Sequence, residues 1–258
     1  MKLLNSTRIT LVFSITIFFT SCGRLNTEIK ARRSNEQGLE FLSQGQFDSA
    51  IATFKAGTSL NGVSKKMKAI LYRNIAQVYN EMDAFDSSIA YSKLSANCYK
   101  PESYDYLVNM ADVDLLTDNT DAAVSKLQKA IKIKNDEVAA NNSLGLIYLG
   151  EYGDDYYNPS KALQFNKKAY EINKDRSTLD VLARNYFLLD DFATAEKYYE
   201  ILTKAFPQFT DYKVILGIVD LKLNKNDEAE ALFQEALQKD SSYIDQINYY
   251  KEEVNSEN

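Results

Sequence analysis

A short phrase built around one small residue returns along most of this chain. Its clearest copies are Phe47-Asp-Ser-Ala50, Phe85-Asp-Ser-Ser88 and Phe192-Ala-Thr-Ala195. The small residue recurs at positions 50, 88, 123, 162, 195 and 229, which gives spacings of 38, 35, 39, 33 and 34 residues. A period in this range indicates stacked helical hairpins of about 34 residues each. The chain is therefore expected to fold as an array of repeated units.

A second small residue precedes each of these positions, by twelve residues in every unit except the fourth, where the interval is seventeen. These residues are Gly38, Ala76, Ala111, Gly145, Ala183 and Gly217. Two short side chains at matched points let paired helices cross closely. Larger side chains lie four residues after the small residue of the repeated phrase, which is helical spacing, at Phe54, Leu127, Tyr199 and Phe233. The aromatic residues Phe41, Tyr79, Tyr148 and Tyr186 are expected to fill the space beside the crossings.

Composition supports an all-α fold. Only 9 Gly and 3 Pro occur in 258 residues, and 45% of the residues are apolar. An all-β chain would need many more turn-forming residues. So few breakers favour long helices and short turns.

The combination of period, paired small residues and a proline after Phe206 resembles the tetratricopeptide repeat. That resemblance implies an α-solenoid, a right-handed superhelix of six helical hairpins followed by a capping helix and frayed tail at residues 242–258. The expected repeats cover about residues 31–65, 69–102, 104–137, 138–175, 176–209 and 210–241. The fourth unit carries five extra residues before Pro159-Ser-Lys-Ala162, and so resembles the Sel1-like variant. Ordinary tolerance of insertion in a solvated turn explains the same feature.

The first 22 residues read as an export signal. A basic start at Lys2 and Arg8, an apolar run over residues 9–19 and small residues before Cys22 are typical of a secretory signal peptide. Phe19-Thr-Ser-Cys22 resembles the lipobox of bacterial lipoproteins, which implies cleavage after residue 21, lipidation of Cys22 and a short tether over residues 22–30. An uncleaved anchor or a short buried helix is the alternative. The expected location is the cell envelope, as a lipid-anchored protein on a membrane, with the outer membrane preferred, facing the periplasm.

Charge and residue usage exclude several functions. The formal net charge is -6 and there is no histidine. Acidic surfaces repel nucleic acid, and histidine is the commonest general base and neutral metal ligand. We therefore expect no cofactor, no metal site, no small-molecule substrate and no nucleic-acid partner. Cys98 has no disulfide partner if Cys22 is acylated, and is interpreted as a small buried side chain or a reactive thiol.

The resemblance also implies a binding groove on the concave face, lined by the first helix of each hairpin. The corresponding positions are Arg73, Asn74, Gln77, Asn80, Asn109, Asp112, Asn142, Leu146, Arg184, Phe187, Val214 and Ile218. Amides suit the backbone of an extended peptide and apolar residues suit its side chains. The alternative is that these side chains are merely solvated or packed against one another. Asn35 and Leu39 stand where the carboxylate-clamp branch of the family has its first Lys and Asn, so that clamp is not expected.

These observations lead to three hypotheses about function. The first is a membrane-anchored adaptor of the bacterial envelope that binds a protein or peptide, similar in architecture to pilotin lipoproteins and to repeat lipoproteins that position envelope proteases or β-barrel assembly factors. The second is a polysaccharide hydrolase that uses paired acids such as Asp154-Asp155 or Asp190-Asp191. Such pairs are more often turn residues or helix caps. The third is a self-assembling structural protein.

Overall fold

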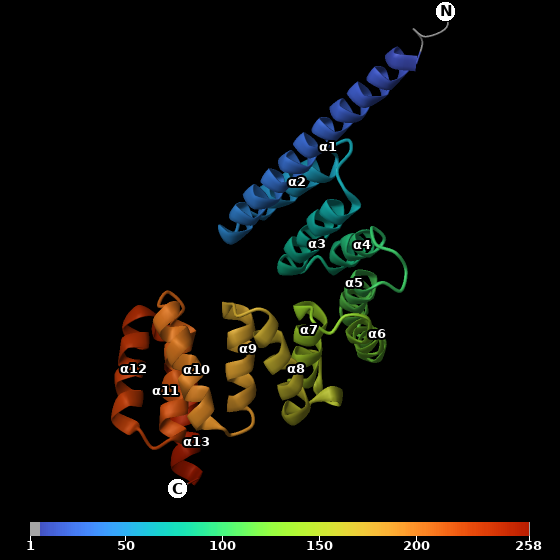
Figure 1. Cartoon of the computed structure of the whole chain (residues 1–258). Helices are drawn as coiled ribbons and strands as arrows, with labels where there is room; N and C mark the ends of the chain where they lie inside the picture. Colours follow the sequence, from blue (N-terminus) through green and yellow to red (C-terminus); the bar gives the residue numbers. More distant parts are fainter. Residues whose placement is uncertain (1–5, 258) are drawn as a thin grey trace, which may run out of the picture. The chain divides into compact units, whose positions relative to one another are not determined.

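The computed structural model describes the backbone of residues 6–257 and the side chains of residues 25–254 and 256. Within that range every regular element is a helix, so the predicted all-α fold is confirmed. The helices form six hairpins and one C-terminal helix (Figure 1). They divide into two compact units, unit 1 ending at Ile133 and unit 2 beginning at Lys134.

Each unit contains three hairpins. In unit 1 the paired helices are α1 (Ser6–Ser43) with α2 (Phe47–Thr58), α3 (Lys65–Glu81) with α4 (Phe85–Ala96), and α5 (Tyr104–Leu115) with α6 (Thr120–Ile133). In unit 2 they are α7 (Val138–Tyr148) with α8 (Pro159–Ile172), α9 (Arg176–Phe187) with α10 (Phe192–Ala205), and α11 (Thr210–Lys222) with α12 (Asn226–Lys239). Helix α13 (Ile244–Glu257) follows, and it continues through residues expected to fray.

The predicted small residues lie where the two helices of a hairpin touch. A methyl group on Gly217 of α11 would come within 2.6 Å of the ring of Phe233 on α12, and one on Gly38 of α1 would overlap the ring of Phe54 on α2. Both rings are buried. The missing side chain on one helix thus makes room for an aromatic side chain on the other, as close packing requires.

The six turns inside the hairpins share one geometry. Each has a residue with positive φ shortly after the first helix: Gly45, Asp83, Asp118, Gly150, Asp190 and Asn224. The next N–H then donates to a carbonyl five residues back, for example from Ala84 to Tyr79 at 2.8 Å. Gly, Asn and Asp tolerate this left-handed conformation best, and the bond satisfies a free carbonyl at the helix end. Recurrent turn chemistry therefore fixes the hairpin geometry.

In three of the hairpins, a pair of stacked aromatic side chains joins the first helix to the second. Tyr79 stacks on Tyr91 and Tyr186 on Tyr198, with ring centroids 5.5 and 5.6 Å apart. Tyr148 stacks in the same way on Phe165 at 5.7 Å. The expected filling role of Tyr79, Tyr148 and Tyr186 is therefore met by a partner ring on the second helix. Offset stacking of this kind adds to the stability gained from burial.

The insertion in the fourth hairpin forms a longer turn. Gly150 and Gly153 have positive φ, and a 3₁₀ turn, η1 (Asp154–Tyr156), follows them. The N–H of Asn158 then donates to the carbonyl of Tyr148 at 2.8 Å, and the Asn158 side chain caps α8. The extra residues thus form a longer turn whose two ends are joined by this hydrogen bond, and α7 and α8 still pair as a hairpin.

The beginning of unit 1 differs from the expected short tether. Helix α1 runs from Ser6 to Ser43 and includes residues 23–30. The side chain of Glu28 accepts hydrogen bonds from the N–H and Oγ of Ser64, at 3.1 and 2.9 Å. Packing against the start of α3 therefore orders residues that the sequence suggested were a linker. The side chain of Cys22 lies outside the described residues. In the described part of the chain, no helix has the length and apolarity required to cross a membrane.

Candidate partner-binding surface

One face of α3 in unit 1 carries a stripe of side chains that point away from the core. Its members are Lys66, Ile70, Arg73, Gln77 and Asn80, spaced by three or four residues as on a single helix face. Four of them are exposed and Ile70 is half-buried. Of the predicted groove residues, Arg73, Gln77 and Asn80 therefore form a continuous accessible surface. We call these five residues the α3 stripe.

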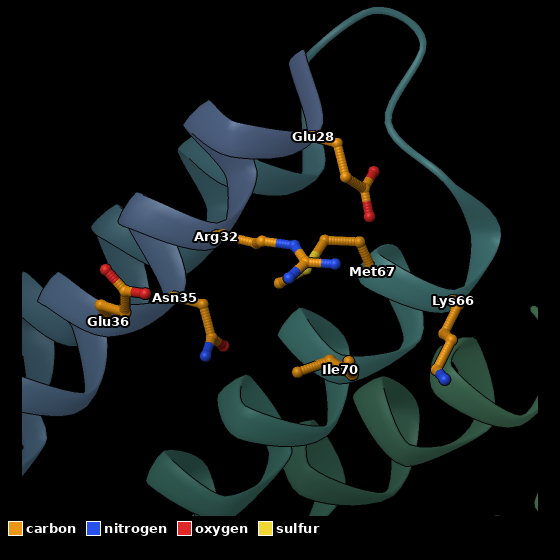
Figure 2. A pocket seen from close by; sticks show the side chains of 7 residues that line it. All are labelled: Glu28, Arg32, Asn35, Glu36, Lys66, Met67 and Ile70. Atoms are coloured by element: carbon orange, nitrogen blue, oxygen red, sulfur yellow. The ribbon is translucent and has the colours of Figure 1, made fainter. Parts of the chain in front are cut away.

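A pocket of about 310 Å³ opens at the N-terminal end of the α3 stripe, between α1 and α3 (Figure 2). Met67 and Ile70 supply apolar surface from α3. Around them lie the charged side chains Glu28, Arg32, Glu36 and Lys66, and the amide of Asn35. A mixture of an apolar floor with a few polar groups suits one side chain of a bound peptide.

Asp112 of α5 faces the positive charge of Arg73. It is half-buried, and its burial raises the pKa of this carboxyl to about 6, although Arg73 acts in the opposite direction. Desolvation therefore exceeds the attraction of the guanidinium. The two predicted groove residues thus lie near each other on one surface of unit 1.

Replacing Asp112 by Asn is expected to stabilise unit 1 near neutral pH. Because the pKa is higher in the folded state, the folded chain binds more protons between about pH 4 and pH 6, and the free energy of unfolding falls as the pH rises through this window. Partial exposure of Asp112 limits the free-energy cost of its charge. We therefore expect the free energy of unfolding of the variant to be higher by about 1 to 2 kcal/mol at about pH 7.5. The gain should shrink toward zero at about pH 4.

Urea unfolding of both proteins at the two pH values measures this difference. A variant that is less stable than the wild type at neutral pH would mean that the carboxylate is stabilised by Arg73, contrary to the balance described above.

Two predicted groove residues in unit 1 are structural. Asn74 is buried, and its Nδ2 donates to Oδ1 of Asn35 at 2.7 Å. Asn109 is also buried; its Oδ1 accepts from Oγ of Ser95 at 2.7 Å, and its Nδ2 donates to the carbonyl of Asp105 at 2.7 Å. Their amides are used within the fold because a buried polar group must be hydrogen-bonded. Their assignment to an open groove is wrong.

In unit 2, four predicted positions are half-buried: Asn142 and Leu146 on α7, and Arg184 and Phe187 on α9. The guanidinium of Arg184 pairs with the carboxylate of Glu151, in the turn after α7. The Oδ1 atom of Asn142 is enclosed and has no hydrogen-bond partner among the described residues. These side chains therefore offer a smaller and more internally engaged surface than the α3 stripe.

The remaining two positions, Val214 and Ile218 on α11, cannot line an open groove. Both are buried in a cluster that includes Ile247 and Val254 of α13. Lys222 of α11 pairs with Glu253 of α13 at 2.9 Å, and Tyr243 donates to Asp211 at 2.5 Å. The expected capping helix is present, and it covers these residues. The groove assignment is wrong here because the chain's own last helix occupies that face.

Some structural polar contacts were not foreseen. Asn166, at the position filled by Phe54 and Phe233 in other hairpins, donates to Asn185 at 2.8 Å, and Asn185 donates to the carbonyl of Pro159 at 2.8 Å. Gly145 leaves the space that the Asn166 side chain occupies. A polar residue at a position that is large and mainly apolar in four of the six hairpins was the available signal.

The described residues contain no group of acids, cysteines or histidines arranged to hold a metal ion. Cys98 is half-buried, and burial raises the pKa of its thiol while Lys68 and Lys65 oppose this effect. A raised thiol pKa disfavours the reactive interpretation, because the thiolate is the nucleophile.

Comparison with known proteins identifies the repeat. A family model described as "Tetratricopeptide repeat" matches residues 181–244, which include most of α9 and all of α10, α11 and α12. Residues 181–244 are therefore assigned to the tetratricopeptide repeat. No curated protein matches its sequence.

Solved structures resemble the fold over most of the chain. A structure from "Functional Characterization of Pseudomonas Aeruginosa pilF" has a TM-score of 0.59 at 15% identity, covering 90% of this chain and 100% of that one. The structure titled "Crystal structure of YrrB: a TPR protein with an unusual peptide-binding site" has a TM-score of 0.53 at 14% identity, and the match covers 71% of this chain and 92% of that one. The APC/C hetero-tetramer Cut9-Hcn1 has a TM-score of 0.66 at 13% identity. The match covers 87% of this chain, which spans only 42% of that one. Identities this low establish the fold alone.

Proposed function

We propose that this tetratricopeptide-repeat protein is a membrane-anchored scaffold of the bacterial cell envelope that binds a peptide or partner helix on the α3 stripe. The observation that carries the proposal is the stripe itself. Arg73 and Asn80 are exposed and take part in no hydrogen bond or ion pair found among the described side chains, and Gln77 bonds only to the nearby Glu81. Polar groups that the fold does not use are available to a partner.

The stripe has the chemistry to hold a peptide backbone. The amides of Gln77 and Asn80 each provide both a donor and an acceptor, as a backbone requires. Ile70 and Met67 provide an apolar seat in the pocket at the other end of the stripe. Arg73 between them favours a partner with an acidic or neutral side chain at the matching position, although Asp112 reduces that preference.

Support for membrane anchoring comes from the sequence. The apolar segment at residues 9–19 and the Phe19-Thr-Ser-Cys22 motif resemble a lipoprotein signal. Acylation of Cys22 would hold unit 1 at a membrane, because several acyl chains give stable attachment. The membrane we propose is the outer membrane, on its periplasmic face. The partner is then another envelope protein.

One of the two acid pairs that suggested an enzyme has structural roles. Asp190 is the positive-φ residue of its turn, and Asp191 caps α10 by accepting from the N–H of Thr194 at 3.2 Å. Asp154 and Asp155 lie exposed on η1. Neither pair lines the pocket between α1 and α3, and glycoside hydrolysis requires two carboxyl groups that converge across a pocket. We therefore propose a function without catalysis.

Photocrosslinking in intact cells tests the partner-binding function. A photoreactive amino acid at Gln77 is expected to capture a distinct polypeptide, because this residue is at the centre of the stripe. The same amino acid at Gln128, which is exposed on α6, is the matched control and should not capture it. Identical capture at both positions, or none at Gln77, would remove the α3 stripe from the function.

A further inference from the structure

Charge is segregated between the two ends of unit 1. The turns inside its hairpins, residues 40–48, 79–88 and 112–123, contain nine acidic residues and no Lys or Arg. The opposite end, residues 28–36, 55–68, 93–105 and 126–133, contains twelve basic and four acidic residues. The expected lipid attachment at Cys22 precedes this basic end on α1.

Ordinary helix and turn chemistry explains part of this pattern. Asp48, Asp86 and Asp121 lie in the first turns of second helices, and Lys55, Lys93 and Lys132 lie in the last turns of second helices. Both placements complement the helix dipole. Asp83 and Asp118 occupy positive-φ turn positions. These residues therefore need no function in binding.

Several cations at the basic end have no such explanation, among them the four residues Lys30, Arg33, Lys65 and Lys68. Lys65 and Lys68 lie in the first turn of α3, which contains no acid, although the positive end of the helix dipole disfavours cations there. Lys30 and Arg33 lie on α1. All but the half-buried Lys68 are exposed. The ion pairs found among the described side chains join residues between 114 and 253, so none involves these four cations.

The structure holds these cations at one level close to the lipid attachment point. The hydrogen bonds from Ser64 to Glu28 fix the start of α3 beside residue 28 of α1. Residue 28 is six residues after Cys22 on the same helix, a rise of about 9 Å. This rise is comparable with the distance over which charges act at physiological salt, about 8 to 10 Å.

We propose that the end of unit 1 that carries Lys30, Arg33, Lys65 and Lys68 is a contact surface for anionic phospholipid headgroups, and that this contact orients unit 1 on the membrane. The proposal rests on the lipid anchor of the proposed function. Juxtamembrane clusters of Lys and Arg are attracted to anionic lipid surfaces. The acidic end is repelled by the same surface, so both ends favour one orientation.

Energy transfer from unit 1 to labelled lipids tests the contact. The full chain purified from membranes is labelled on Cys98, which lies close enough to Lys68 and Lys65 for their charges to act on its thiol. It is reconstituted into vesicles of phosphatidylcholine alone or with about 30% phosphatidylglycerol. Transfer is expected to be stronger in the anionic vesicles, and this difference should disappear at about 0.5 M salt. A donor at Asp83→Cys, with Cys98→Ser, should show weaker transfer.

Charge variants complete the test. Changing Lys30, Arg33, Lys65 and Lys68 together to Gln should abolish the dependence on phosphatidylglycerol. The matched control, with Lys174, Lys197, Lys204 and Lys239 of unit 2 changed to Gln, should retain it, since these residues are also exposed. Circular dichroism confirms that each variant is folded.

Three results would overturn the proposal. Transfer that is independent of anionic lipid in the wild type would exclude the contact, as would stronger transfer from position 83. Binding of a labelled oligonucleotide that the four substitutions abolish would assign the surface to nucleic acid instead. A chain that floats with neither kind of vesicle would overturn the anchor and this proposal together, whereas one that floats with both kinds without the lipid dependence would overturn the contact alone.

Discussion

Replacing Gly217 by Leu is expected to lower the free energy of unfolding of unit 2 by about 3 kcal/mol, because overpacking forces buried neighbours out of place. Even a single methyl group at this position would lie 2.6 Å from the ring of Phe233. That ring is 1% exposed and lies in the buried cluster between α11, α12 and α13. Urea unfolding followed by circular dichroism measures the loss.

A second substitution separates this clash from a general effect of a larger residue. Phe233→Ala alone should cost about 3 to 5 kcal/mol through the cavity that it leaves. In the double variant the Leu side chain can occupy part of that cavity, so the combined loss should be smaller than the sum of the single losses by at least about 1 kcal/mol. Gln128→Leu on the exposed face of α6 is the control and should change stability by less than about 0.5 kcal/mol. Additive losses at Gly217 and Phe233 would show that the two residues are not packed together.

Replacing Ile247 by Asp is expected to detach α13 from α11. Ile247 is 1% exposed and packs in the cluster with Val214 and Ile218. Loss of the buried side chain costs about 2 to 5 kcal/mol, and an unpaired buried charge adds to it. Amide hydrogen exchange in α13 should therefore accelerate strongly, and α11 should lose part of its protection.

Tyr249→Asp provides the matched control on the same helix. Tyr249 is 63% exposed, so a carboxylate there remains in water and exchange in α13 should change little. Equal acceleration in the two variants would mean that α13 is not held by its buried face, and that Val214 and Ile218 are covered only loosely.

The hairpin core could be predicted from the sequence because its pattern is local. Gly217 and Phe233 belong to one hairpin, and the recurrence of small and large residues at matched points along the chain is enough to identify both of them. The same holds for the all-α fold, the six hairpins and the closing helix. Short-range periodicity determines which side of each helix meets its partner.

The candidate surface was harder to predict because it depends on neighbours. Arg73 and Asn74 were both assigned to the groove, but adjacent helix residues point about 100° apart, and only Arg73 is exposed. Val214 and Ile218 are covered by a helix that follows about 30 residues later. The pocket that Figure 2 shows requires α1 to lie against α3, which the contact between Glu28 and Ser64 helps to fix. None of these tertiary contacts has a local sequence signal.

The most direct test of the scaffold function is the affinity of the chain for the polypeptide captured from Gln77. Changing Arg73 and Gln77 together to Ala should raise the Kd at least about tenfold, which corresponds to about 1.4 kcal/mol. Gln128 and Lys132 on α6 have the same kinds of side chain at the same spacing and are also exposed, so changing both to Ala is the control and should leave the Kd unchanged. An equal Kd for the two double variants would contradict the assignment of partner binding to the α3 stripe.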